Sequence, residues 1–331
     1  MRSSKIVIAL VCLGVLVLLF LIGPRPQIDT AARKVSPEIP EQLSALPEWL
    51  RKKESDLGNV VPGAEKQIVW ANPEQPAQTD IAVLYLHGFS ASRQEIAPVP
   101  ELVAKALNAN IYLTRLPGHG RGTEVMTNAT ANDWLEGAWE SWQIVSKLGR
   151  KVVVISVSTG APLNVWLMQT QPGVQEKTVA SIYVSPNFAV NNKASSMLAW
   201  PWSKHWVPWV LGREYSWEPK DELQAKYWTT RYGVKVLSQL QVLLNWAAKQ
   251  DYSSIKVPLL LINNDKDKVV DPKAADRVYA AWGGYKQHVE ILAPGDANSH
   301  VIIGDIMHPE NNDAAVKSML TFLEKVQNSS Q

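Results

Sequence analysis

The sequence predicts an α/β protein with a mostly parallel central sheet. Six short apolar runs have the length of buried strands, and they alternate with segments whose apolar residues recur at helical spacing. Alternation of this kind is typical of crossover units, in which a helix connects two parallel strands. The 331 residues suit one large domain of this class or two modest ones.

The composition excludes several other classes of protein. Lys and Arg number 33 against 31 Asp and Glu, so the net charge is only +2 and no nucleic-acid partner is expected. Because 46% of the residues are hydrophobic, the chain lacks the composition of a disordered protein. The one cysteine, Cys12, cannot form an intramolecular disulfide or a thiolate metal cage, and there is no HExxH motif. We therefore expect no metal and no cofactor.

The N-terminal region contains a long apolar run. Residues 6–22 carry no charge and no Gln, Asn, Ser or Thr, and as a helix they would be about 26 Å long. We predict a transmembrane helix here, with residues 1–23 as a membrane anchor or signal. Arg2 and Lys5 favour a cytoplasmic N-terminus, so a membrane-anchored chain with its catalytic domain outside the cytoplasm is expected. Secretion after signal cleavage is the first alternative, and a buried core helix is the second.

Residues 24–65 are expected to form a tether that ends in a packing helix. Four prolines in the first half of this segment prevent a long helix there. Residues 43–57 place Leu46, Trp49 and Leu50 on a common face, which predicts one short amphipathic helix.

Residues 66–185 and 252–331 are expected to form the α/β core. The predicted parallel strands are residues 81–86, 110–113, 151–155, 181–184, 258–262 and 288–292. An antiparallel edge strand is expected at residues 67–70, and the predicted helices are residues 101–107, 134–148 and 313–326. In such sheets ligands bind at the carboxyl ends of the strands, so functional residues are expected just after these runs.

Residues 186–251 contain no predicted buried strand, and we interpret this segment as a helical cap over the sheet. It holds seven of the 14 tryptophans, namely Trp200, Trp202, Trp206, Trp209, Trp217, Trp228 and Trp246. These side chains have three interpretations: the core of the cap itself, the wall of an acyl pocket, or a surface that touches a bilayer. For Trp200, Trp202 and Trp206 we predict contact with the substrate.

The sequence after the 151–155 strand matches a nucleophile-elbow pattern. Ser156-Val-Ser158-Thr-Gly160 lies between that strand and a helical run, which is the strand–turn–helix context that the motif requires. Ser158 stands at the apex, where the turn exposes its hydroxyl. The motif usually has Gly where this chain has Ser156. A turn serine without a partner is the alternative interpretation of this pattern.

A serine nucleophile needs a base, and six histidines are available. His300 follows the last predicted strand by a loop at residues 293–299, which is the strand-end position where catalytic groups are expected. His308 lies farther on, before a proline, and is predicted to be a surface residue. His87 and His119 are predicted to shape loops. The sequence therefore favours His300 as the base.

A third group must hold the base in one tautomer. The 258–262 strand leads into a loop with three aspartates, Asp265, Asp267 and Asp271. Two valines and a proline-led helix follow Asp267, and this arrangement favours Asp267 as the orienting acid. For Asp265 and Asp271 the alternative is a solvated turn or a helix cap.

With these residues in place, residues 69–323 resemble the α/β-hydrolase superfamily, particularly its carboxylesterase and monoacylglycerol-lipase-like branch. The chain order Ser158, Asp267, His300 is that of the superfamily. His87-Gly-Phe89 resembles the oxyanion loop of the branch, and the Leu-Pro-Gly-His-Gly run at 116–120 resembles a second loop. The resemblance implies an α/β-hydrolase fold and an oxyanion hole formed by the backbone amides of Phe89 and Thr159.

The sequence therefore predicts a serine hydrolase that cleaves carboxylic esters through an acyl-enzyme. The apolar tryptophans of the cap favour a medium-chain or monoacyl lipid ester as the small-molecule substrate, and residues 6–22 imply a membrane as a further partner. A serine peptidase or amidase on the same scaffold is one alternative. A non-catalytic, membrane-tethered binding protein is the other, and the complete set of Ser158, Asp267 and His300 argues against it.

Overall fold

Seven strands form one sheet in the part of the chain that the computed structural model describes, residues 2–294 and 297–329. Their order is β1-β3-β2-β4-β5-β8-β9, and all neighbouring pairs are parallel except β1 with β3. The strands are β1 (Gln67–Val69), β2 (Thr79–Leu86), β3 (Asn110–Leu113), β4 (Gly149–Val157), β5 (Thr178–Val184), β8 (Leu259–Asn263) and β9 (Lys286–Glu290).

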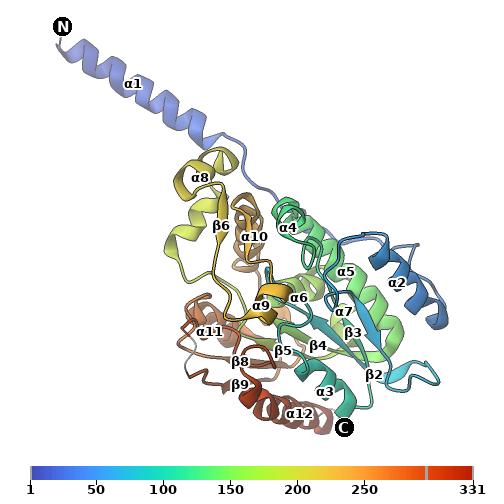
Figure 1. The fold of residues 1–331 in the computed structure, drawn as a ribbon. Helices are drawn as coiled ribbons and strands as arrows, with labels where there is room; N and C mark the ends of the chain where they lie inside the picture. The colour runs from blue at the N-terminus through green and yellow to red at the C-terminus, as the bar shows by residue number, and fades with distance from the viewer. Residues whose placement is uncertain (1, 295–296, 330–331) are drawn as a thin grey trace.

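Helices cover both faces of this sheet (Figure 1). The α-helices are α1 (Arg2–Leu21), α2 (Leu46–Ser55), α3 (Val99–Ala106), α4 (Thr123–Asn128), α5 (Ala131–Leu148), α6 (Gly160–Thr170), α7 (Val174–Lys177), α8 (Ser203–Leu211), α9 (Glu222–Tyr227), α10 (Lys235–Ala247), α11 (Pro272–Ala281) and α12 (Asn312–Asn328). Single-turn or short 3-10 helices are η1 (Leu43–Ala45), η2 (Lys193–Ala199), η3 (Tyr252–Ser254) and η4 (Pro309–Asn311).

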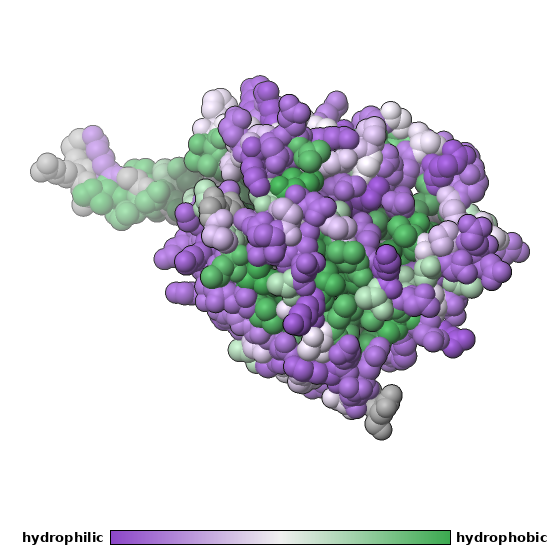
Figure 2. Space-filling view, turned by 60° about the horizontal axis from the view of Figure 1, so that its bottom comes forward, coloured by the Kyte–Doolittle hydropathy of each residue, from purple (hydrophilic) through white to green (hydrophobic). Residues whose placement is uncertain are grey.

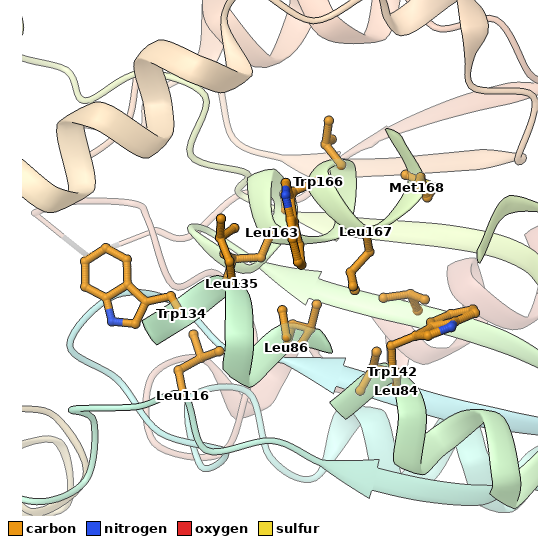
Figure 3. Packing of buried hydrophobic residues seen from close by; sticks show 14 of the residues in the cluster. Leu84, Leu86, Leu116, Trp134, Leu135, Trp142, Leu163, Trp166, Leu167 and Met168 are labelled. Carbon is orange, nitrogen blue, oxygen red and sulfur yellow. The ribbon is translucent and has the colours of Figure 1, made fainter. Parts of the chain in front are cut away.

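The core has two halves, one on each face of the sheet. Side chains of β2 and β4 alternate between them, so that Leu84 and Leu86 face one half while Val83 and Tyr85 face the other. Helices α5, α6 and α11 pack on the first face, and α3 and α12 pack on the second. Figure 3 shows the first half, where leucines of β2 meet tryptophans and leucines of α5 and α6. The α/β-hydrolase architecture predicted from the sequence is confirmed for the sheet and its flanking helices.

The predicted transmembrane helix is wrong. In the part of the chain that the structure describes, no helix is both long and apolar enough to cross a bilayer. Helix α1 does form, and it projects from the body as an apolar arm (Figure 2). Its first four residues, from Arg2 to Lys5, are polar or charged, so its apolar part is about 24 Å long at ~1.5 Å per residue. A hydrocarbon core about 30 Å thick requires about 20 apolar residues in a row.

The predictions that depended on this span are corrected with it. A membrane partner through residues 6–22 and a membrane-anchored catalytic domain outside the cytoplasm both required a helix that crosses the bilayer, and no described helix does so. The alternative, secretion after signal cleavage, stays a prediction.

The segment that follows α1 packs along the core. The indole N–H of Trp166 in α6 donates to the Thr30 carbonyl at 3.0 Å, and that of Trp139 in α5 donates to the Lys34 carbonyl at 2.8 Å. Farther on, Glu54 at the end of α2 forms a buried ion pair with Arg115 at 2.7 Å. These contacts bring α2 onto the loop that follows β3.

Residues 186–251 contain four helical elements, η2, α8, α9 and α10. They also contain two short strands that were not predicted. Strands β6 (Glu214–Ser216) and β7 (Arg231–Gly233) form a small antiparallel ribbon separate from the main sheet. In Figure 1, α8, β6 and α10 lie on one side of the sheet, near the end of α1. The backbone N–H of Trp202 donates to the Pro24 carbonyl at 2.7 Å, which links α8 to the chain after α1.

Candidate active site

Ser158 lies in the tight turn between β4 and α6. Its φ of 48° is in the left-handed region, where a serine is uncommon, and its N–H donates to the Val184 carbonyl at 3.0 Å. The turn also requires Gly160, because a Cβ at that position would lie 2.3 Å from the Leu86 carbonyl oxygen. Strained backbone of this kind is frequent at functional sites. The predicted strand–turn–helix context of Ser158 is therefore present.

Asp267 lies in the turn after β8, and its side chain is buried. One carboxylate oxygen, Oδ1, accepts the N–H groups of Val269 at 2.8 Å and Val270 at 3.0 Å. The other oxygen, Oδ2, is 2.7 Å from His300 Nδ1. Two backbone amides thus fix the carboxylate, which leaves one oxygen directed at the imidazole ring.

His300 contacts both other predicted residues. Its Nδ1 is 2.7 Å from Asp267 Oδ2, and its Nε2 is 3.1 Å from Ser158 Oγ. A carboxylate only accepts hydrogen bonds, so Nδ1 carries the proton of the neutral ring and Nε2 accepts from the serine hydroxyl. The predicted loop at 293–299 before His300 includes residues 295 and 296, which lie outside the described residues.

The three side chains form a chain of hydrogen bonds from a hydroxyl through an imidazole to a carboxylate. An imidazole in this tautomer can take the hydroxyl proton as the oxygen attacks an electrophile, and the carboxylate can stabilise the imidazolium that results. Ser158 and His300 are 142 residues apart in sequence, so only the fold brings them together.

The alternative candidates lie elsewhere. Asp265 is exposed, and Asp271 caps α11 by accepting the Lys273 N–H at 3.0 Å. His308 was predicted to be a surface residue, but it is buried, and its Nδ1 lies 2.8 Å from Glu310 Oε1.

The loop after β2 holds one of the two predicted oxyanion donors. Within the described residues, no protein acceptor takes the N–H of Phe89 or that of Thr159. His87 shapes the loop as predicted: its Nε2 accepts the Leu116 N–H at 2.9 Å, so its Nδ1–H donates to the Gly88 carbonyl at 2.9 Å. Burial lowers the pKa of His87 well below its ordinary value, and the ring is therefore neutral.

Aromatic side chains that the sequence analysis did not single out surround Phe89. Its ring meets Trp134 of α5 at 5.7 Å and Tyr232 of β7 at 5.3 Å, both edge to face. His119 lies 6.0 Å from the same ring, and burial lowers its pKa to about 4. From the sequence, Trp134 was only the first residue of the helix predicted at residues 134–148. Its place beside the oxyanion loop depends on the loop after β3, which no local pattern reveals.

The tryptophans predicted to contact substrate lie on and before α8. Trp200 and Trp202 are exposed, and Trp206 donates its indole N–H to the Pro201 carbonyl at 3.0 Å. Among the described residues, no recorded hydrogen bond or ring contact joins these three to Ser158, Asp267 or His300. The indole N–H of Trp202 instead donates to the Leu19 carbonyl at 3.4 Å.

Two further buried polar groups lie next to the triad. Glu95 accepts the Gly88 N–H at 2.6 Å, and burial raises its pKa to about 7. Ser156, the residue that departs from the usual motif, is fully buried in β4, and its hydroxyl has no hydrogen-bond partner among the described residues. In the same part of the chain, no group of three His, Cys, Asp or Glu side chains is arranged to hold a metal ion.

Comparisons with known proteins agree with this architecture. A thermostable monoacylglycerol lipase of Bacillus sp. (strain H-257) is 29% identical over 104 residues, which are 31% of this chain and 41% of that protein. The match thus spans about two fifths of the length of this curated relative.

Solved structures resemble most of the chain. One, from work on LipS and LipT, two metagenome-derived lipolytic enzymes, has a TM-score of 0.64 at 21% identity and covers 80% of this chain and 99% of its own. The monoacylglycerol lipase of Paleococcus ferrophilus has a TM-score of 0.55 at 17% identity and covers 79% and 98%. At these identities the likeness shows a shared α/β-hydrolase fold.

A family model described as Serine aminopeptidase, S33 matches residues 77–295. The matched region includes Ser158 and Asp267 and ends five residues before His300. Because it spans well over half of the sequence, this chain belongs to that family of α/β hydrolases.

Proposed function

We propose that the protein is a serine hydrolase that cleaves carboxylic esters, with Ser158 as nucleophile, His300 as general base and Asp267 as the acid that orients it. The observation that carries this proposal is the pair of hydrogen bonds at His300, 2.7 Å to Asp267 and 3.1 Å to Ser158. The strained turn that holds Ser158 supports it further, since such turns present a nucleophile at the sheet rim.

The reaction proceeds through two similar halves. Ser158 Oγ attacks the ester carbonyl carbon while its proton moves to His300 Nε2, and Asp267 stabilises the imidazolium. The carbonyl oxygen becomes an oxyanion against the N–H groups of Phe89 and Thr159, each donor being worth roughly 3–4 kcal/mol of barrier. The intermediate then expels the alcohol, which takes the proton from His300. In the second half, a water molecule attacks the acyl-enzyme while His300 takes its proton, and the acid is released as Ser158 regains a proton from His300.

For the substrate we propose a medium-chain or monoacyl lipid ester. The aromatic side chains of Trp134 and Tyr232 beside Phe89 support an apolar acyl group near the oxyanion hole. The monoacylglycerol lipases among the similar proteins support the same class.

Residues 186–251 serve in this proposal as the cap that selects the acyl chain. The Thr229 N–H of this segment donates to the Ser90 carbonyl at 2.7 Å, directly after Phe89. The segment therefore reaches the oxyanion loop. Trp200, Trp202 and Trp206 are proposed to contact the substrate when an acyl chain enters beneath α8.

Amide cleavage is the second candidate, because the family description names serine aminopeptidases. An aminopeptidase needs an anion that binds the substrate ammonium group. In residues 186–251, Glu214 is the residue whose carboxylate pairs with Arg231, and Asp221 caps α9 by accepting the Gln224 N–H. The same segment also carries Glu218, Glu222 and Asp251. Among the described residues, no recorded hydrogen bond or ion pair joins a carboxylate of this segment to Ser158, which favours esters.

The test is labelling with a fluorophosphonate probe, followed by hydrolysis of esters with acyl chains from two to sixteen carbons and of matched amides. We expect a single label on Ser158, ester turnover that exceeds amide turnover, and best activity on medium or long chains. Ser158→Ala should abolish label and turnover while the protein stays folded. Full esterase activity in Ser158→Ala would end the proposal, and activity on acetyl esters alone would end the lipid assignment.

A further inference from the structure

Glu95 is a buried carboxyl group that lies against the oxyanion loop. It is only 2% exposed, it lies between β2 and α3, and its Oε2 accepts the Gly88 N–H at 2.6 Å. A Cβ built on Gly88 would lie 2.8 Å from Glu95 Oε1 and 3.0 Å from Ser158 Cβ. The carboxyl group and the proposed nucleophile therefore flank the same glycine, and only a residue without a side chain fits between them.

The hydrogen bonds at Gly88 fix the direction of the neighbouring oxyanion donor. Glu95 holds the Gly88 N–H, and His87 Nδ1–H holds the Gly88 carbonyl. In a trans peptide the carbonyl of one residue and the N–H of the next point in opposite directions. With the Gly88 carbonyl held by His87, the Phe89 N–H points away from that carbonyl, and among the described residues no backbone acceptor takes it.

The backbone at Glu95, which holds Gly88, is itself closely packed. The backbone of residues 95 and 96 packs against Gly304, where a Cβ would lie 2.9 Å from the Glu95 carbonyl oxygen and 2.7 Å from the Ile96 Cα. Gly304 follows His300 in the same loop. Glu95 is thus packed between the oxyanion loop on one side and the loop that carries the proposed base on the other.

Burial is the main cause of the raised pKa of Glu95, and two titratable side chains, His300 and Tyr85 of β2, act in the opposite direction and lower it. Glu101 of α3 interacts with Tyr85, with Arg93 and with Asp305, while Arg93 interacts with Glu101, Glu65 and Tyr227. Among these groups, His300 is the one that becomes cationic during the proposed reaction and also lowers the pKa of Glu95 through its charge.

We propose that Glu95 is a positioning residue of the hydrolase: its carboxylate holds the Gly88 amide so that the Phe89 N–H faces the oxyanion, and its negative charge favours the His300 imidazolium that forms as Ser158 attacks. This inference rests on the proposed function. It assigns two tasks to one side chain, because the hydrogen bond needs only an oxygen acceptor whereas the electrostatic task needs the ionised carboxylate.

The hydrogen bond to Gly88 and the charge effect on His300 can be told apart because only the charge effect depends on pH. Burial raises the pKa of Glu95 to about 7, so the carboxyl group is mostly neutral at pH 6 and mostly ionised at pH 8. Glu95→Gln keeps an oxygen that can accept the Gly88 N–H but carries no charge at any pH. The wild-type protein and this variant should therefore differ where Glu95 is ionised and converge where it is neutral.

The experiment measures kcat and KM for one ester from pH 5.5 to 8.5, in the wild type, Glu95→Gln, Glu95→Ala and the control Glu101→Gln. Glu101 is a partly buried carboxyl whose pKa is also raised by burial, but His300 is not among its partners. We expect kcat of Glu95→Gln to be about tenfold below wild type at pH 8 and about twofold below at pH 6, with KM unchanged.

Glu95→Ala, which also loses the acceptor, should be slower than Glu95→Gln at every pH, and Glu101→Gln should match the wild type. Circular dichroism and thermal melting check that each variant is folded. If the ratio of the wild-type kcat to the Glu95→Gln kcat does not change with pH, the electrostatic role is overturned. If the kcat of Glu95→Ala equals that of the wild type, the positioning role is overturned.

Failure of this inference is distinguishable from failure of the proposed function. If the wild type hydrolyses esters and Ser158→Ala does not, the proposed function holds whatever the Glu95 variants do. If the wild type neither hydrolyses esters nor takes the fluorophosphonate label, the proposed function and this inference fall together.

Discussion

Two tryptophans of the core and three tryptophans of residues 186–251, namely Trp200, Trp202 and Trp209, occupy opposite environments. Trp134 and Trp166, on α5 and α6, are almost completely buried against the sheet (Figure 3). Trp200 is 46% exposed and Trp209 is 90% exposed, both in the segment that we propose as a cap. The same residue type therefore stabilises the scaffold in one region and remains available for contacts in the other.

The difference suggests that one region positions the proposed catalytic side chains and another selects the ester substrate. The proposed triad and the Glu95 carboxyl group lie on loops that begin at core strands, where close packing fixes side chains to within a few tenths of an ångström. The exposed tryptophans of residues 186–251 have no such constraint. Substitutions at the core rim should therefore change the rate of the chemical step, while substitutions in the cap should change which ester is preferred.

The largest expected effect is that of Asp267→Asn. An amide NH₂ group cannot accept the His300 Nδ1–H, so the imidazole loses both its tautomer and its charge partner, and kcat should fall by about 10³–10⁴. Steady-state kinetics on a single ester measure this. Asp265→Asn, two residues away and exposed, is the control and should retain wild-type kcat. Less than a tenfold loss in Asp267→Asn would contradict the proposed role.

Glu95→Gln should stabilise the fold at alkaline pH. The raised pKa means that the folded state binds the Glu95 proton more tightly than the unfolded state, whose pKa is near 4.5. This stabilisation is present in full below about pH 4.5 and is lost as the pH rises through about 7. The shift of about 2.5 units corresponds to roughly 3 kcal/mol, which the uncharged variant retains at pH 8.

Thermal melting at pH 5 and pH 8 measures this effect. The Tm of Glu95→Gln should exceed that of wild type by more at pH 8 than at pH 5. If the Tm difference between Glu95→Gln and wild type is the same at pH 5 and pH 8, Glu95 does not change its charge in the folded protein between these pH values.

Ser156→Ala should stabilise the core by about 1 kcal/mol, because it removes a buried hydroxyl that has no partner among the described residues. The control is Ser141→Ala. Ser141 is equally buried, but its hydroxyl donates to the Gly137 carbonyl at 2.6 Å and accepts from Thr114 at 3.1 Å, so that variant should lose stability. Urea denaturation of both gives the free energies of unfolding, and a loss in both would indicate that Ser156 is also satisfied.

The smallest expected effect belongs to the cap. Trp200→Ala and Trp202→Ala should lower kcat/KM for a sixteen-carbon ester by less than about tenfold and leave acetyl-ester turnover unchanged, because these side chains are proposed to contact the acyl chain and an acetyl group is too short to reach them. Trp209→Ala is the matched control. A loss in either variant as large as that of Asp267→Asn would remove the distinction between core and cap.

Much of the core was predictable from the sequence, because strands that are buried on both faces carry few polar residues. Strand β3 has the bounds that were predicted, and β1 was predicted as an antiparallel edge strand. The residues that follow β4 and β8 were predictable for a similar reason: the turn residues are small or acidic directly after an apolar run. Strand order then brings the loops that carry Ser158 and Asp267 to the same edge of the sheet.

Other features depend on contacts that no local pattern carries. Strands β6 and β7 are three residues long and largely polar or exposed, so they lack the apolar run that identifies a buried strand. The apolar run near the N-terminus was interpreted by hydropathy as a transmembrane helix, and that was wrong because its helical part is too short and begins with charged residues. Glu95 was not singled out from the sequence, because no local pattern shows that its carboxyl group is buried beside Gly88 or that its backbone packs against the distant Gly304.

The separation of 142 residues between Ser158 and His300 has a consequence for biosynthesis. A ribosome adds Ser158, the proposed nucleophile, well before it reaches His300, the proposed base, and β8 with Asp267 is made in between. During the synthesis of those 142 residues the Ser158 hydroxyl has neither of its two proposed partners. We therefore expect reactivity to appear only when the last third of the chain has folded onto the first two.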